Sequence, residues 1–115
     1  MAAVDAALDR LAELQLQDDG RFVEVFIRSR VSRGQGPVRI AQELRSRGIA
    51  DTAVREALAG DEHDWTVLAR EVLSRQFDGP PADLKGRARQ VRFLEYRGFT
   101  AAQIRAAMKP ADEFE

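Results

Sequence analysis

Arginines are the side chains with the clearest chemical capacity in this sequence of 115 residues. They gather in two stretches, residues 28–47 and residues 89–97, where few acids stand close by to neutralise them. A guanidinium group forms paired hydrogen bonds to phosphate or carboxylate oxygens, so both stretches favour an anionic partner over ordinary solubilising arginines. The candidate binding residues are Arg28, Arg39, Arg45, Arg47, Arg89, Arg92 and Arg97.

Groups that could support catalysis or hold a metal are sparse. His63 is the only histidine, and consecutive acidic neighbours at a helix start do not easily converge with it on one ion, so a solvated helix cap is favoured. Gly34-Gln35-Gly36 lacks the lysine and the spacing of a phosphate-binding loop. The serines have no histidine nearby in sequence, and zero cysteines exclude thiolate nucleophiles, disulfides and zinc knuckles. We therefore expect no enzyme, no metal and no cofactor.

Charge is segregated along the chain, although the formal net charge is only −1. Residues 1–20 carry one basic and five acidic groups, whereas residues 21–60 carry eight basic and four acidic groups. Residues 61–84 carry two basic and six acidic groups, and residues 85–115 carry seven basic and four acidic groups. This alternation predicts basic surfaces set apart from acidic ones. Exposed aromatic residues do not interleave with the arginines, so any nucleic-acid contact is expected at the backbone, without base stacking.

A repeat of the sequence after fifty residues organises the chain. Aligning Arg47-Gly48-Ile49 with Arg97-Gly98-Phe99 places Leu44 on Leu94 and Val54 on Ile104. Such a period indicates stacked units, none of which can bury its apolar face alone. Few aromatic residues and no credible strand favour an all-α fold, built here from tandem helical repeats. The expected divisions are residues 1–17 (last helix of a first repeat), 18–60 (second repeat), 61–110 (third repeat) and 111–115 (acidic tail).

Apolar spacing predicts the helices of the first two divisions. An amphipathic helix with an acidic outer face is expected over residues 4–16. The next helix has its arginines, Arg28, Arg30 and Arg33, turned away from the core, and its buried residues are Phe22, Val23, Phe26, Ile27 and Val31. Gly36-Pro37 starts a helix whose inner face is Ile40, Ala41 and Leu44. Gly48 is expected to close it in a left-handed conformation, and Asp51 to cap a short helix carrying Val54, Ala57 and Leu58.

The third division repeats this plan. Acids at residues 61–64 suit a helix start, and the core residues of that helix are predicted to be Trp65, Leu68, Val72 and Phe77. Gly79-Pro80-Pro81 breaks the chain before a longer basic helix that ends near Arg97 and has Val91 and Leu94 inward. Thr100 and Gln103 form a capping box for a last helix with Ile104, Ala107 and Met108 inside, ending near Pro110.

Three motifs resemble the RecX family, bacterial regulators of the RecA recombinase. They are Leu16-Gln17-Asp18-Asp19-Gly20-Arg21-Phe22, the stretch from Gly34-Gln35-Gly36-Pro37-Val38-Arg39-Ile40 through Glu43-Leu44 to Gly48-Ile49, and Val91-Arg92-Phe93-Leu94-Glu95-Tyr96-Arg97-Gly98-Phe99. Their order and spacing carry the resemblance across nearly the whole chain. It implies an all-α fold of three tandem three-helix repeats in an elongated, curved array of either hand. It also implies two more helices before residue 4, so the chain is expected to be either a natural short form or part of a longer one.

The resemblance further implies a partner and an activity. A RecX protein lies in the groove of the RecA filament on DNA and restrains ATP hydrolysis, strand exchange and co-protease action. The seven arginines are then candidates for a concave basic surface that bridges RecA subunits and touches DNA. The alternative is a helical DNA-binding module acting alone on phosphates, although its recognition helix would carry only Arg55. The sequence has no run of membrane-spanning length and no secretory signal, which predicts the cytoplasm.

Overall fold

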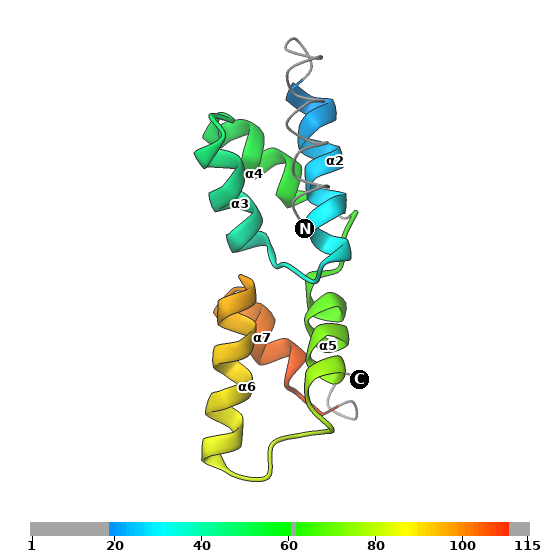
Figure 1. The fold of residues 1–115 in the computed structure, drawn as a ribbon, viewed down its shortest axis with the longest axis vertical. Coiled ribbons are helices and arrows are strands. Elements are labelled where there is room, and N and C mark those ends of the chain that lie inside the picture. The colour runs from blue at the N-terminus through cyan, green and yellow to red at the C-terminus, as the bar shows by residue number, and fades with distance from the viewer. Residues whose placement is uncertain (1–18, 61, 111–115) are drawn as a thin grey trace.

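The computed structural model describes residues 19–60 and 62–110, and both ranges are helical (Figure 1). The helices are α2 (Asp19–Ser32), α3 (Pro37–Ser46), α4 (Asp51–Ala59), α5 (Trp65–Gln76), α6 (Leu84–Arg97) and α7 (Ala101–Ala107). These two ranges contain no strand, so the predicted all-α class is confirmed. The helix expected over residues 4–16 and the expected tail, residues 111–115, lie outside the described residues.

The helices form two groups of three, as the repeat predicted. Helices α2, α3 and α4 pack against one another, and α5, α6 and α7 do the same. In Figure 1 the first group lies above the second along the long axis, with α2 above α5 and α3 above α6. The principal dimensions are 50 × 30 × 18 Å, which is an elongated arrangement. We call α2–α4 the first unit and α5–α7 the second unit.

Each unit has its own apolar core. The buried residues of the first core are Phe22, Val23, Phe26, Ile27, Ile40, Ala41, Leu44 and Val54. Those of the second are Ala69, Leu94, Phe99, Ile104 and Ala107. The predicted inner faces are confirmed with two exceptions. Ala57 is exposed on α4, and Trp65 packs against the first core because α5 begins at the boundary between the units.

Helix ends mostly follow the chemistry expected of them. Gly48 and Gly98 both have positive φ, +88° and +97°, as predicted for Gly48. Thr100 and Gln103 form the predicted capping box, and Asp64 accepts a hydrogen bond from the Val67 amide at 3.1 Å. The expected cap at Asp51 is wrong. Ala50 holds that position, because the helical backbone already begins at Asp51. The Asp51 carboxylate instead accepts a hydrogen bond from Arg45 at 2.8 Å.

The start of α3 meets the end of α6 at the boundary between the units. The Gly36 amide donates to the Arg97 carbonyl and the Val38 amide donates to the Gly98 carbonyl, each at 2.8 Å. Pro37, between them, has no amide hydrogen to leave unsatisfied. The first amides of a helix and the last carbonyls of a helix lack partners within their own helices, so each end satisfies the other. The helix dipoles are also joined head to tail, which is the favourable arrangement.

Two glycines make this contact sterically possible. A Cβ on Gly36 would lie 2.5 Å from the Gly98 carbonyl oxygen, and a Cβ on Gly98 would lie 2.7 Å from the Arg39 amide nitrogen. Both clashes are with backbone atoms, which cannot move without separating the units. Gly98 also needs its left-handed φ. Gly48 shares that φ, but a Cβ there would meet no atom within 4 Å.

Substituting Gly48 and Gly98 separates the energetic cost of backbone strain from the cost of disturbing the contact between units. Gly48→Ala should lower the free energy of unfolding by about 1–2 kcal/mol, the cost of a left-handed alanine. Gly98→Ala should lower it by that amount plus about 1–3 kcal/mol from the backbone clash. Urea unfolding followed by circular dichroism measures both losses. Equal losses in the two variants would contradict a tight contact between α3 and α6.

Candidate functional site

Three of the seven candidate arginines pair with acids in their own unit. The pairs are Arg28–Glu24 at 3.9 Å, Arg39–Glu43 at 3.6 Å and Arg45–Asp51 at 2.8 Å. In each of the first two pairs, the two residues are four positions apart on the same helix. The third pair spans the turn between α3 and α4. The expectation that few acids neutralise these arginines is therefore wrong for the first unit. The pairs of Arg28 and Arg45 face solvent and contribute little to stability, so a stronger anion can replace their acids.

Two other candidate arginines lie against aromatic rings. The guanidinium carbon of Arg47 is 5.2 Å from the centre of the Phe26 ring, and that of Arg97 is 5.3 Å from the Phe93 ring. Arg97 also donates from Nη1 to the Arg33 carbonyl oxygen at 3.0 Å, across the boundary between the units. Arg97 is half-buried, and this hydrogen bond helps to hold the two units together.

The remaining two candidates, Arg89 and Arg92, are exposed on α6. Neither has an ion pair or a hydrogen bond from its side chain to any other described residue. Lys85 precedes them on the same helix, and the spacing of four and three residues puts all three cations on one face. We call Lys85, Arg89 and Arg92 the α6 stripe. Arg87 is also exposed on α6, outside this spacing.

Tyr96 continues the stripe by one further turn of α6. Its side chain is large and its residue is 79% exposed, which is unusual for an aromatic ring. Arg39 of the first unit lies over it, with the guanidinium carbon 5.7 Å from the ring centre. Arg39 also donates to the Tyr96 carbonyl oxygen at 3.4 Å. The expectation that no exposed aromatic accompanies the basic residues is therefore wrong. The spacing of residues 85, 89, 92 and 96 places them on one face of a helix, so this group could have been predicted from the sequence.

A cavity of about 320 Å³ adjoins Tyr96 where the two units meet. Its lining comes from α3 and from the end of α6, and comprises Val38, Arg39, Gln42, Glu95, Tyr96 and Gly98. The contact between the units thus builds a surface that neither unit carries alone. This surface, together with the α6 stripe, is the candidate functional site.

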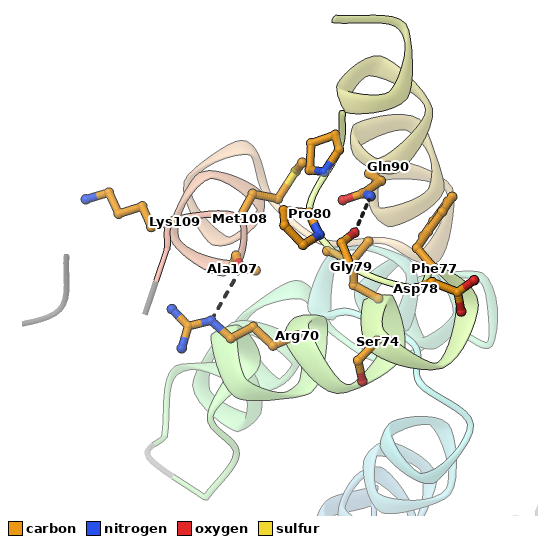
Figure 2. Close-up of a pocket in the computed structure, with 12 residues that line it drawn as sticks. Arg70, Ser74, Phe77, Asp78, Gly79, Pro80, Gln90, Ala107, Met108 and Lys109 are labelled. Atoms are coloured by element: carbon orange, nitrogen blue, oxygen red, sulfur yellow. Dashed lines mark hydrogen bonds between the residues drawn. The ribbon is translucent and has the colours of Figure 1, made fainter. Parts of the chain in front are cut away.

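A larger cavity, of about 460 Å³, lies within the second unit between α5, α7 and the loop before α6 (Figure 2). Figure 2 shows two of its polar side chains, Arg70 and Gln90, hydrogen-bonded to backbone carbonyls. Arg70 donates to the Ala107 carbonyl at 3.3 Å, and Gln90 donates to the Gly79 carbonyl at 3.0 Å. These bonds brace α7 against α5 and the loop against α6. The described residues that line this cavity include no histidine or cysteine.

Within residues 19–60 and 62–110, no cluster of three or more histidine, cysteine, aspartate and glutamate side chains is arranged to hold a metal ion. His63, the candidate ligand that the sequence offered, has its ring 5.5 Å from the Trp65 ring. None of the helices described here is long and apolar enough to cross a membrane.

Arg30 is the cation whose position the sequence did not reveal. It is only 2% exposed, whereas it was expected to point away from the core. Its Nε lies 2.9 Å from Glu43 Oε2, and its guanidinium carbon lies 4.3 Å from the centre of the Phe26 ring. A buried charge is tolerated only when it is paired, so Glu43 is needed to keep Arg30 inside. This pair links α2 to α3.

Glu43→Ala should therefore destabilise the protein more than removal of a surface acid. We expect the free energy of unfolding to fall by about 1–3 kcal/mol, because the variant leaves a buried guanidinium without its carboxylate. Glu24→Ala removes the exposed partner of Arg28 and should change the free energy of unfolding by no more than about 0.5 kcal/mol. Chemical unfolding of both variants gives the comparison. A Glu43→Ala loss as small as that of Glu24→Ala would show that Arg30 does not depend on Glu43.

Both units match models of one protein family. Residues 18–58 match the model of the RecX second three-helix domain, and residues 64–108 match that of the RecX third three-helix domain. The first span covers α2, α3 and all but the last residue of α4, and the second covers α5, α6 and α7.

Curated relatives agree with the domain matches. The chain is 58% identical over 111 residues to the regulatory protein RecX of Halorhodospira halophila, covering 96% of this chain and 69% of the relative. It is 49% identical to that of Chromohalobacter salexigens, covering 96% and 72%, and 41% identical to that of Pseudomonas entomophila, covering 97% and 73%. The resemblance drawn from the three motifs is confirmed, and the family is named as regulatory proteins and not as enzymes. This chain belongs to the RecX family of regulatory proteins.

Proposed function

We propose that this chain binds the RecA nucleoprotein filament and inhibits its ATPase, strand-exchange and co-protease activities. The observation that supports this most directly is the match of both helical units to successive RecX domains. The relatives are named as regulatory proteins. We propose that the target of this regulation is the RecA filament. The protein acts in DNA repair and in control of the SOS response, in the cytoplasm.

The physical basis of inhibition is a stiff body that contacts neighbouring RecA subunits together. The contact of α3 with α6 fixes the two units relative to each other, because two amide–carbonyl hydrogen bonds join backbones that Gly36 and Gly98 allow to meet. A body about 50 Å long that bridges subunits restrains the movements that each hydrolysis cycle needs. The α6 stripe, together with Arg28 and Arg45, whose ion pairs are exposed, supplies the cations that meet anionic groups of the filament.

We also propose the division of the chain that the repeat implies. Residues 18–60 and 61–110 form the second and third repeats, residues 1–17 supply the last helix of the first, and residues 111–115 form an acidic tail. In this arrangement the two described units form the filament-binding part of the protein.

A titration into RecA assembled on single-stranded DNA tests the function. We expect ATP hydrolysis to slow at well below one chain per RecA, because one bound body restrains more than one subunit. Arg89→Ala/Arg92→Ala should need a higher concentration for the same effect. Circular dichroism verifies that each protein is folded. An unchanged ATPase rate with folded wild-type protein in excess over RecA would contradict the proposal.

A further inference from the structure

We propose that the cavity within the second unit binds a small, uncharged aromatic molecule that carries one hydrogen-bond donor, such as an indole or a phenol. The ring of this ligand lies against Phe77 and Met108, and its N–H or O–H group donates to Oε1 of Gln90. This binding site goes beyond the proposed regulation of the filament, because it involves neither RecA nor the α6 stripe.

The cavity has the size and the walls of a small-molecule site. Its volume of about 460 Å³ lies within the usual range of ligand pockets, about 300–1,000 Å³. Helices α5 and α7 and the loop between α5 and α6 each supply part of its lining (Figure 2). The apolar side chains of this lining are Leu73, Phe77, Pro80, Pro81, Ala107 and Met108. A molecule held there contacts several separate elements of the second unit.

The apolar walls favour a flat aromatic ring. The Phe77 ring is held in place by Phe93, whose ring meets it edge to face with 5.5 Å between the ring centres. Met108 is unbranched and adapts its shape to a neighbouring ring, and its sulfur makes favourable contacts with aromatic edges. Pro80 and Pro81 stiffen the loop, because the pyrrolidine ring fixes φ. An aromatic ligand therefore finds rigid walls at Phe77 and the prolines and an adaptable wall at Met108.

Gln90 is a buried polar residue that presents an unused acceptor to this cavity. It is only 4% exposed. Its Nε2 donates to the Gly79 carbonyl at 3.0 Å, and none of the described residues donates a hydrogen bond to its Oε1. Figure 2 shows this oxygen on the side of the amide that faces Met108. Because a buried acceptor without a donor is costly, an N–H or O–H group of a ligand is favoured at this point.

The charged residues of the lining argue against an ionic ligand. Arg70 donates to the carbonyls of Ala106 and Ala107 at 3.2 and 3.3 Å, so its guanidinium group is engaged with the end of α7. Asp78 and Lys109 are exposed and opposite in charge. Figure 2 shows the ammonium group of Lys109 directed away from the cavity. An uncharged ring with one donor therefore fits the cavity better than a carboxylate or an amine does.

Binding of 5-fluoroindole, followed by fluorine NMR without RecA, tests the donor. We expect a saturable change in the fluorine signal as protein is added. The compound 5-fluorobenzofuran has nearly the same shape but an oxygen atom in place of the N–H group, so it should bind about five- to hundredfold more weakly. In Gln90→Leu the two compounds should bind with similar affinity, because the acceptor is gone. Equal affinities of the two compounds for the wild-type protein would overturn the proposal, and this comparison requires no substitution.

The position of the ring is tested separately. The methyl signal of Met108, labelled with carbon-13 and assigned with Met108→Leu, should move upfield when the ring of 5-fluoroindole lies against it. Leu73→Ala should weaken binding about tenfold, because it removes apolar surface from the cavity wall. Its matched control is Leu68→Ala on the same helix, which should bind as the wild-type protein does. Both leucines are half-buried against the second core, but Leu73 lines the cavity and Leu68 does not.

The outcomes that would overturn the proposal are distinct from those of the filament experiment. They are the absence of saturable 5-fluoroindole binding, an unmoved Met108 signal at saturation, or equal losses of affinity in the two leucine variants. Because RecA is absent from these measurements, each of them is independent of the ATPase result.

Discussion

The rest of the structure depends on the seating of one helix end on another. The first amides of α3 hydrogen-bond to the last carbonyls of α6, and glycines at positions 36 and 98 let the two backbones approach closely. Without this contact the two units would be joined only by the chain between α4 and α5 and by side chains at the boundary. With it, α6 continues into α3 as one stacked column along the molecule (Figure 1). The surface around Tyr96 exists because residues of both units meet there.

The same column explains why the arginines have different roles. Arg97 and Arg39 lie at the boundary, where each donates a hydrogen bond across it and lies near an aromatic ring. Arg30 is buried and holds α3 to α2 through Glu43. Arg89 and Arg92 lie below the boundary, on a helix whose neighbouring turns offer almost no acid. A cluster of arginines in a sequence therefore combines residues that hold the fold together with residues that remain available to a partner.

Much of the fold was predictable because it depends on local rules. The glycine and proline breaks, the capping box at Thr100 and the apolar spacing within each helix all act within a few residues, and the structure confirms them. The burial of Arg30 was not predictable, because Glu43 is thirteen residues away and belongs to another helix. Trp65 was assigned to the wrong core for the same reason, since its neighbours come from the first unit. The role of Gly36 against Gly98 was also hidden, because a sequence shows that a glycine is present but not which backbone approaches it. By contrast, the face formed by Lys85, Arg89, Arg92 and Tyr96 was present in the spacing of α6 itself.

The central claim is that this two-unit body meets the RecA filament through α6. Site-specific photo-cross-linking tests it directly, with the photoreactive residue placed at position 92 on α6 or, as a control, at position 75 on α5. Both positions are exposed and basic in the native chain, so the two proteins differ mainly in which helix carries the probe. The account predicts cross-links from position 92 to RecA or to its bound DNA, and few from position 75. Equal yields from both positions, or a higher yield from position 75, would contradict it.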